Sequence, residues 1–273
     1  MKKEKKMFKR VIFFLIVTIV HIHQLNSASE LTHAYIAKRW LNYNKKSAKY
    51  SEAYRSAFIR GTLFPDIRYF ADISRENTHD KNVTLQEIFS CDDAFEAGKK
   101  LHAFVDEFID EPENKKKLTD IKKIAVKILQ KKAPDVQKHV VMLLKFAEDD
   151  IIFTQNDRCH EIPKYFGKLD ATMRTFNVPD KKLHAWYKLL KTIYFSGKIS
   201  SESFSQPDIV NFFKNIPAHE LSQFGPSIKA LAKNKQIKKY TRDRLREFDK
   251  RFKIFFKNQK KSNATTATLS AAL

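Results

Sequence analysis

The scarcity of glycine constrains the fold of this chain more than any other feature of its sequence. Five glycines occur among 273 residues, and no two of them are close together. Phosphate-binding loops, dinucleotide fingerprints and G-x-S-x-G nucleophile elbows need glycines at short fixed spacings, because the backbone there turns sharply or approaches a ligand closely. We therefore exclude most nucleotide-binding α/β enzymes and the α/β-hydrolases.

The apolar residues favour helices. Leu31, Ile36 and Trp40 recur at helical spacing, as do residues in many later segments, and no clear period-two run is present. No Gly/Pro/Ser-rich linker divides residues 30–261, so we predict an all-α fold with a single multi-helix domain. The predicted helices cover residues 29–43, 47–60, 91–111, 115–131, 134–154, 164–176, 180–196, 207–215, 217–233 and 236–258.

Local signals set several predicted boundaries. Gly61 and Pro65 are expected to end a helix, which makes G-T-L-F-P-D a turn. Residues 72–83 are polar and are predicted to form a loop. Ser90 and Asp93 have the spacing of a capping box, which predicts that a helix begins there.

The N-terminus has the layout of an export signal. A positive segment, M-K-K-E-K-K-M-F-K-R, precedes a ten-residue apolar run and the small residues Ser27, Ala28 and Ser29. That run is short for a bilayer, which needs about 20 apolar residues. We predict a signal peptide at 1–29 and a secreted or periplasmic protein, with an uncleaved membrane anchor as the alternative. Export permits a Cys91–Cys159 disulfide, but the sequence does not decide whether the two residues meet.

The positive charge is concentrated near the C-terminus. The net charge is +21, and residues 233–261 hold 13 Lys or Arg and three acids. Five apolar residues there lie on one helical stripe: Leu245, Phe248, Phe252, Phe255 and Phe256. We expect the stripe to pack on the body with the lysines solvated; alternatively, the basic face binds an anionic membrane surface or nucleic acid. Residues 262–273 are small, polar and uncharged, which predicts a disordered tail.

One helix carries a pair of residues that can bind a metal ion. His102 and Asp106 are separated by four positions, so on a helix they lie on one face, one turn apart. Imidazole and carboxylate together suit zinc. The surrounding helix is rich in aliphatic and aromatic residues, so we expect the pair to be partly buried and in need of partners.

Three upstream residues are candidate partners for this pair. His33 lies in L-T-H-A-Y, Asp66 in G-T-L-F-P-D, and His79 in E-N-T-H-D. Each also has an ordinary interpretation, because Asp66 can close a turn and the two histidines can face water.

Taken in order, these short sequence motifs resemble those of the bacterial zinc-dependent phospholipase C family. The resemblance covers about residues 30–110 and rests on T-H, G-x-x-x-P-D, a second T-H and H-x-x-x-D. It implies an all-α protein with helices packed around a metal site, and hydrolysis of phosphodiester bonds in phospholipid headgroups.

The resemblance also implies roles for single residues. Asp66, His79, His102 and Asp106 would surround one zinc ion, and Asp106 would bridge to a second ion that His33 also holds. Asp66 would in addition handle the attacking water, as the catalytic residue.

The chain departs from the family in three places. The family begins its mature chain with a tryptophan whose amine and carbonyl bind zinc, whereas here we expect Ser29 or Glu30 first. Pro112 stands where the family has a histidine, and no later H-x-x-x-E pair occurs. Glu148 or Asp149 can supply a further ligand, or both are solvated charges of a helix. We therefore expect one to two zinc ions and no third.

Three functions remain open from the sequence. The first is an exported zinc-dependent phosphodiesterase acting on phospholipid or another phosphodiester. The second is a single-strand nuclease of the same architecture, which the basic C-terminal third would suit. The third is a helical binding protein that keeps a metal site without turnover, which the missing late histidines would suit.

Overall fold

All regular structure in the described part of the chain is helical. The computed structural model describes residues 28–43, 50–71, 73–155, 176–194 and 215–271, with isolated positions between 161 and 213. Within these residues the predicted all-α class is confirmed. Three predictions lie wholly or mostly outside the described residues: the signal peptide at 1–29, of which residues 1–27 are not described, the helices at 164–176 and 207–215, and the disulfide that would need Cys159.

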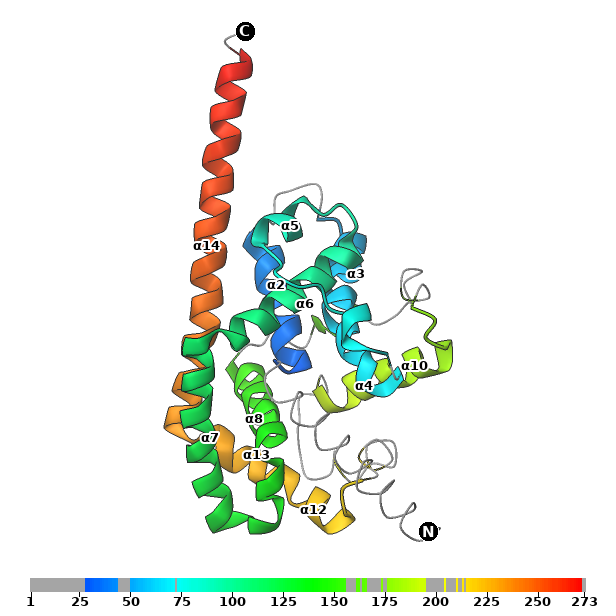
Figure 1. Ribbon diagram of the computed structural model, residues 1–273, viewed down its shortest axis with the longest axis vertical. Coiled ribbons are helices and arrows are strands. Elements are labelled where there is room, and N and C mark those ends of the chain that lie inside the picture. The colour runs from blue at the N-terminus through cyan, green and yellow to red at the C-terminus, as the bar shows by residue number, and fades with distance from the viewer. Residues whose placement is uncertain are drawn as a thin grey trace, which may run out of the picture.

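Figure 1 shows the order of the elements along the chain. The α-helices are α2 (Glu30–Tyr43), α3 (Glu52–Leu63), α4 (Arg68–Ala71), α5 (Leu85–Ser90), α6 (Ala94–Asp110), α7 (Pro112–Lys132), α8 (Val140–Gln155), α10 (Asp180–Leu189), α12 (Ala218–Ser222), α13 (Phe224–Lys233) and α14 (Lys235–Ala271). The tighter or wider turns are the 3₁₀ helices η1 (Phe64–Ile67), η2 (Arg75–Asn77) and η3 (Pro134–His139) and the π-helix η5 (Leu190–Tyr194).

The helix α3 does not end where the sequence predicted. It passes through Gly61 to Leu63 and leads directly into η1 and α4. Pro65 lies in the first turn of η1. The N–H groups of a first turn have no hydrogen-bond partner within the helix, so proline, which lacks this N–H, is tolerated there. The predicted turn at G-T-L-F-P-D was therefore wrong, because the glycine serves helix packing and the proline begins the next helical turn.

The caps around α5 and α6 also differ from the prediction. The capping box is Thr84 with Glu87, which starts α5: Glu87 N donates to Thr84 Oγ1 at 3.2 Å and Thr84 N donates to Glu87 Oε2 at 2.8 Å. Asp93 caps α6 alone by accepting from Glu96 N at 2.8 Å. The single helix predicted for 91–111 is thus preceded by a separate short one.

Two glycines bring α3 and α6 into very close contact. A Cβ atom on Gly98 would lie 2.1 Å from the backbone oxygen of Phe58, and one on Gly61 would lie 2.0 Å from that of Phe95. Both contacts are with backbone, which cannot move aside as a flexible side chain can. Only glycine at both positions allows this crossing, and the crossing sets α3 against the helix that carries His102 and Asp106.

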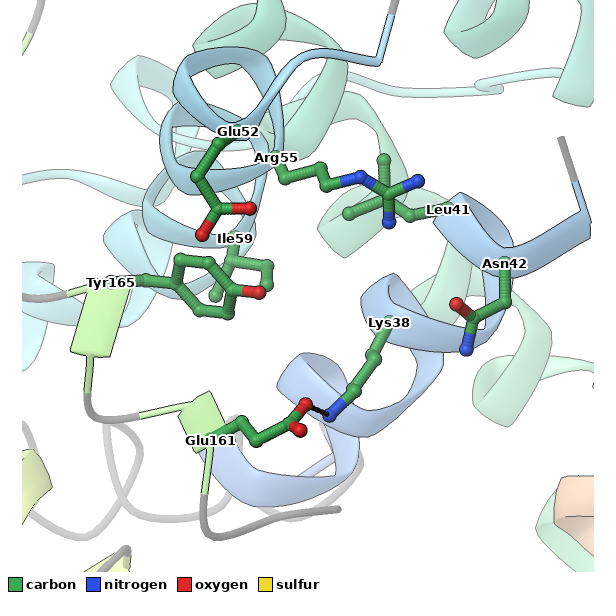
Figure 2. A pocket seen from close by; sticks show the side chains of 8 residues that line it. All are labelled: Lys38, Leu41, Asn42, Glu52, Arg55, Ile59, Glu161 and Tyr165. Atoms are coloured by element: carbon green, nitrogen blue, oxygen red, sulfur yellow. Dashed lines mark hydrogen bonds and ion pairs between the residues drawn. The ribbon is translucent and has the colours of Figure 1, made fainter. Parts of the chain in front are cut away.

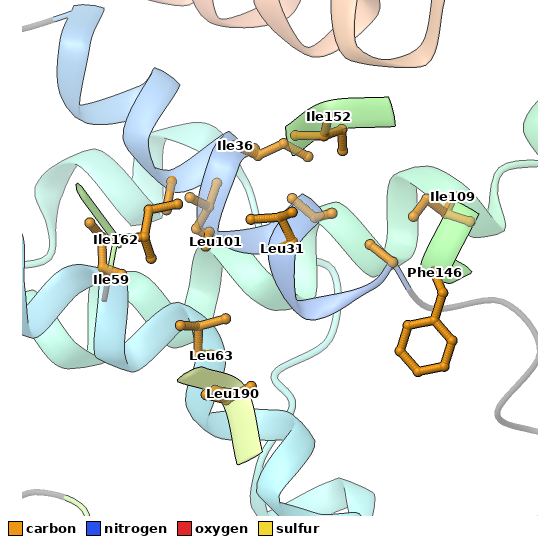
Figure 3. Close-up of a cluster of buried hydrophobic side chains, with 14 of the residues drawn as sticks. Leu31, Ile36, Ile59, Leu63, Leu101, Ile109, Phe146, Ile152, Ile162 and Leu190 are labelled. Carbon is orange, nitrogen blue, oxygen red and sulfur yellow. The ribbon is translucent and has the colours of Figure 1, made fainter. Parts of the chain in front are cut away.

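The helix α2 lies at the centre of the core. Leu31, Ile36 and Trp40 are buried, as are most other residues around its circumference. A helix with buried residues on most of its circumference must be enclosed by other elements, and α2 packs against α3, α6, α8 and α14. Figure 3 shows Leu31 and Ile36 among aliphatic side chains from several helices, including Leu101 of α6.

The aromatic stripe of α14 packs on the body as expected. Phe248, Phe252 and Phe256 are buried, and the last two lie 5.1 and 4.7 Å, ring centroid to centroid, from Trp40 of α2. The ring centroid of Phe248 lies 4.2 Å from that of Phe108 of α6. This contact fixes α14 against the two helices that also carry the candidate ligands His33, His102 and Asp106.

The helix α14 continues beyond the body. Figure 1 shows its last turns extending past α5, and it remains helical to Ala271. We had expected disorder from residue 262, so residues 262–271 differ from that prediction. An established helix adds one hydrogen bond per residue without a new nucleus, and alanine favours this growth. None of the described helices combines the length and the apolar character needed to cross a membrane.

Candidate metal centre

The helix α6 supplies the centre of a buried polar cluster. His102 and Asp106 are both fully buried, and His102 Nε2 lies 3.6 Å from Asp106 Oδ2. Their spacing of one helical turn places both on the face that α6 turns toward α2 and α3. Ionisable groups at this depth need partners or a bound ion.

The orientation of His102 leaves one ring nitrogen facing the cluster. His102 Nδ1 lies 2.8 Å from the backbone oxygen of Thr62, which the close α3–α6 crossing brings within reach. A carbonyl only accepts, so Nδ1 carries the proton and Nε2 has a lone pair in the neutral ring. Such a backbone contact is the usual way in which a metal-binding histidine is oriented.

Asp66 and His79 lie on the same side of His102. Asp66, in η1, has its Oδ1 4.0 Å from His102 Nε2. His79, just after η2, has its Nε2 3.1 Å from His102 Nε2, while its Nδ1 lies 2.8 Å from Thr78 Oγ1. One ligand atom from each of the three residues lies within 4.8 Å of the others, so this buried triad can hold a metal ion.

His33 approaches from the opposite side, on α2. Its Nε2 lies 3.3 Å from Asp106 Oδ1, and its ring stacks on that of His102 with centroids 3.8 Å apart. His33, His102 and Asp106 form a second buried triad with ligand atoms within 4.8 Å. His102 therefore belongs to both triads.

Asp106 belongs to the second triad and also lies close to residues of the first. Its Oδ1 faces His33, and its Oδ2 lies 3.5 Å from His79 Nε2 and 3.6 Å from His102 Nε2. A carboxylate has enough lone pairs for two cations at once. The structure thus brings all five residues that the sequence singled out into one cluster. Because His102 has one free lone pair, at Nε2, it can bind an ion in either triad but not in both at once.

Several polar atoms of the cluster have no hydrogen-bond partner among the described residues. These atoms are both ring nitrogens of His33 and Oδ1 of Asp66. The distance of 3.3 Å between His33 Nε2 and Asp106 does not amount to a hydrogen bond because its direction is unfavourable. Buried polar atoms without partners are rare, and a binding site for an ion is one of their recognised explanations.

The charges of the cluster favour free lone pairs on two of the histidines. Burial lowers the pKa of His33 to about 4, with the neighbouring His102 adding to the effect. Burial also lowers the pKa of His79. For His102 burial acts in the same direction, but Asp66 and Asp106 outweigh it and raise the pKa. Burial alone would raise the pKa of Asp106, but its contacts with His102, His33 and His79 outweigh burial and hold that pKa well below the ordinary value.

Two contacts at Asp106 were missed by the sequence analysis. The buried backbone N of Ala28 donates to Asp106 Oδ1 at 3.3 Å, and Arg75 Nη2 donates to Asp106 Oδ2 at 3.2 Å. The small residues around Ala28 were the only signal for the first contact. No sequence signal pointed to Arg75, because η2 falls in a segment predicted as a loop.

Glu148 and Asp149 do not join the cluster. Arg244 of α14 donates to Glu148 Oε2 at 2.5 Å, and Ser29 donates a short hydrogen bond to Asp149. Both acids are buried, so the expectation that they are solvated charges is wrong. Neither belongs to either triad of candidate ligands. The reason is that α8 packs between α2, α13 and α14.

A separate pocket of about 240 Å³ lies between α2 and the start of α3. Its lining includes Lys38, Arg55, Glu52 and Glu161 but none of the five clustered residues. Figure 2 shows Lys38 bound to Glu161 at one side of this pocket, with Nζ and Oε2 2.5 Å apart. The pocket is therefore not part of the candidate metal centre.

The ligand set fits zinc. Imidazole nitrogens and carboxylate oxygens are its usual ligands besides cysteine, and zinc tolerates several geometries. Comparison of the chain with models of known protein families, with curated proteins and with solved structures gave no match. The case for function therefore depends on the cluster itself.

Proposed function

We propose that this protein is an exported zinc-dependent phosphodiesterase that acts on phospholipid headgroups, as the resemblance to phospholipase C implies. One observation carries the proposal: two buried triads share His102, and Asp106 of the second triad also lies close to His79 of the first. One to two zinc ions are expected, because neither Glu148 nor Asp149 belongs to either triad.

The five residues have two kinds of role in the proposed hydrolysis, as zinc ligands and as the acceptor of a proton from water. His33, His79 and His102 would hold zinc through nitrogen, and Asp106 would hold it through oxygen. A zinc ion held there would lower the pKa of a water ligand to about 7 and would stabilise negative charge on the phosphoryl oxygens. Asp66 accepts the proton of the attacking water, and its Oδ1, which has no hydrogen-bond partner among the described residues, supports that role.

The position of Ala28 suggests where the mature chain begins. Its backbone N is buried and 3.3 Å from Asp106, at the side that His33 faces. Cleavage after Ser27 would place a free α-amino group there, and a neutral amine is a further nitrogen ligand. This cleavage site lies one residue before the earliest start that we expected from the sequence. The mass of the exported protein, measured intact, tests it.

The basic face of α14 is proposed to bring the enzyme to an anionic membrane surface. Arg242, Arg246, Lys250 and Lys253 are exposed, whereas the aromatic stripe is largely committed to the body. Replacing these four by Glu should weaken binding to vesicles that contain phosphatidylglycerol, and salt near 0.2 M should weaken wild-type binding. Equal binding by both proteins would contradict this part of the proposal.

Hydrolysis by the zinc-loaded protein tests the proposed activity. Wild type should hydrolyse bis-p-nitrophenyl phosphate with zinc and lose this activity with a chelator. Asp66→Asn should lower kcat by about 10²–10⁴-fold. Asp249→Asn is the control, since Asp249 pairs with Arg39 on α2, at 2.7 Å, and is not part of the cluster.

The outcomes separate the three functions. Zinc-dependent hydrolysis of phospholipid vesicles in preference to single-stranded oligonucleotide supports the proposal. Preference for the oligonucleotide would favour the nuclease. Tight zinc binding with no hydrolysis of any phosphodiester would leave a binding protein with a metal site.

A further inference from the structure

Arg75 places a permanent positive charge at the edge of the cluster. Its Nη2 lies 3.2 Å from Asp106 Oδ2, yet its side chain is 41% exposed, whereas that of Asp106 is buried. The guanidinium therefore reaches from solvent to a carboxylate that lies close to residues of both triads. A side chain in this position lines the approach to the cluster.

The same turn fixes the backbones of Arg75 and His79 relative to each other. The backbone oxygen of Arg75 accepts from Thr78 N at 3.0 Å and from His79 N at 2.9 Å. Thr78 Oγ1 also donates to this oxygen at 3.3 Å and lies 2.8 Å from the His79 ring. One compact turn thus carries a candidate metal ligand and a cation that both reach Asp106.

The chemistry of the guanidinium group suits an anionic ligand better than a carboxylate alone. Arginine has five N–H donors in a planar fork and binds phosphate oxygens in pairs. Its contact with Asp106 is through Nη2. A phosphate at the cluster would lie near the same nitrogen, and the exposed part of the side chain leaves room for the fork to turn toward it.

We propose that Arg75 binds the phosphate of the substrate at the solvent side of the metal centre. It would be a substrate-binding residue that adds to the five clustered ones and favours phosphodiesters over uncharged esters. This inference rests on the proposed function, because it assumes that a phosphodiester is held at the cluster.

Phosphate binding provides a test that does not need turnover. Inorganic phosphate is titrated into the zinc-loaded protein by calorimetry, for wild type, Arg75→Gln and Arg75→Lys. Arg75→Gln should raise the Kd for phosphate by about 10- to 100-fold, as expected for the loss of a hydrogen bond between charged groups. Arg75→Lys should recover part of the affinity, because it keeps the charge but not the fork. Zinc content should stay the same in all three.

Arg39→Gln is the matched control. The Arg39 side chain is 40% exposed and pairs with Asp249, so it resembles Arg75 in exposure and pairing but lies outside the cluster. It should bind phosphate as wild type does. Unchanged phosphate affinity in Arg75→Gln, with or without a loss of thermal stability, would overturn the inference and leave Arg75 as a counter-ion of Asp106.

The activity of the same variants distinguishes this inference from the proposed function. In Arg75→Gln, KM for bis-p-nitrophenyl phosphate should rise by about the same factor as the Kd for inorganic phosphate, with a smaller change in kcat. A wild type that binds zinc and phosphate but hydrolyses nothing would contradict the proposed function, while the phosphate titration would still decide the role of Arg75.

Discussion

Two regions of this protein bury ionisable groups, and they treat them in opposite ways. Where α14 meets the body, the charges form pairs between 2.5 and 2.9 Å. The pair of Arg244 with Glu148 is buried, and those of Arg39 with Asp249 and Arg251 with Glu111 are partly exposed. At the cluster, three imidazoles surround two carboxylates, and the closest approach of any imidazole to a carboxylate is 3.3 Å.

The difference separates a structural role from a ligand-binding one. A buried charge that is paired directly is already satisfied and needs nothing further. Ligand-type atoms that face one another at 3–4 Å, some of them without any hydrogen-bond partner among the described residues, leave room for a cation at the 2.0–2.2 Å distances of zinc ligands. Burial alone would not have told the two regions apart, since Arg244, Glu148, His102 and Asp106 are all buried.

The largest effect should come from breaking the buried pair on α14. The Arg244 and Glu148 side chains are each 5% exposed. Arg244→Met leaves the Glu148 carboxylate buried without a partner, so the free energy of unfolding should fall by about 3–5 kcal/mol. Urea denaturation of the zinc-free protein measures this change.

The double variant Arg244→Met/Glu148→Leu sharpens the same test. Removing both charges should recover most of the lost stability, because a well-packed apolar pair often replaces a buried ion pair without loss. A double variant no more stable than Arg244→Met would contradict the assignment of a purely structural role to this pair.

The next largest effect should come from the crossing of α3 and α6. Gly98→Ala places a methyl group against the backbone oxygen of Phe58, so the two helices must move apart, at a cost of about 1–3 kcal/mol or more. The movement should also separate Thr62 from His102 and weaken zinc binding. Ala97→Ser, at the neighbouring buried position, is the control for any disturbance of α6. A stable Gly98→Ala protein with normal zinc affinity would show that the crossing does not position the ligands.

A smaller effect should depend on pH. Burial raises the pKa of Asp149 well above its ordinary value, so the folded state holds a proton that the unfolded chain releases. The free energy of unfolding should therefore fall by up to about 1.4 kcal/mol per pH unit above pH 4, until the raised pKa is reached. Asp149→Asn lacks this contribution, so it should gain stability relative to wild type between pH 4.5 and 7. A constant difference across this range would contradict the prediction.

The smallest effect on stability should come from the cluster itself. Asp66→Asn removes the charge of a carboxylate whose Oδ1 has no hydrogen-bond partner among the described residues, so zinc-free stability should change by less than about 1 kcal/mol. The stabilisation that added zinc provides should nevertheless fall if Asp66 is a ligand. Thermal unfolding with and without zinc gives both values. A large loss of stability in the zinc-free protein would show that Asp66 has a structural role, like the paired charges of α14.

The fold class and the membership of the cluster could be predicted from the sequence. Helical spacing gave the all-α class, which is a local property of the chain. His102 and Asp106 share a helix face, and the upstream words around His33, Asp66 and His79 led to their grouping. The burial of Phe248 and Phe252 also followed from spacing alone.

Contacts between distant segments could not be predicted from the sequence. Gly61 was interpreted as a helix end, because only the crossing with α6 shows why a glycine lies within α3. Arg244 looked like one more solvated cation, and its partner Glu148 is 96 residues away. Ala28 and Arg75 reach Asp106 across 78 and 31 residues, distances over which neither periodicity nor spacing carries information.

Zinc content per chain tests the central claim most directly. Mature protein purified without chelators should carry one to two zinc ions by elemental analysis. His102→Ala, which removes the residue shared by both triads, should lose most of this zinc, whereas Arg39→Gln should keep it. A wild-type zinc content near zero, or an equal content in His102→Ala, would contradict the account.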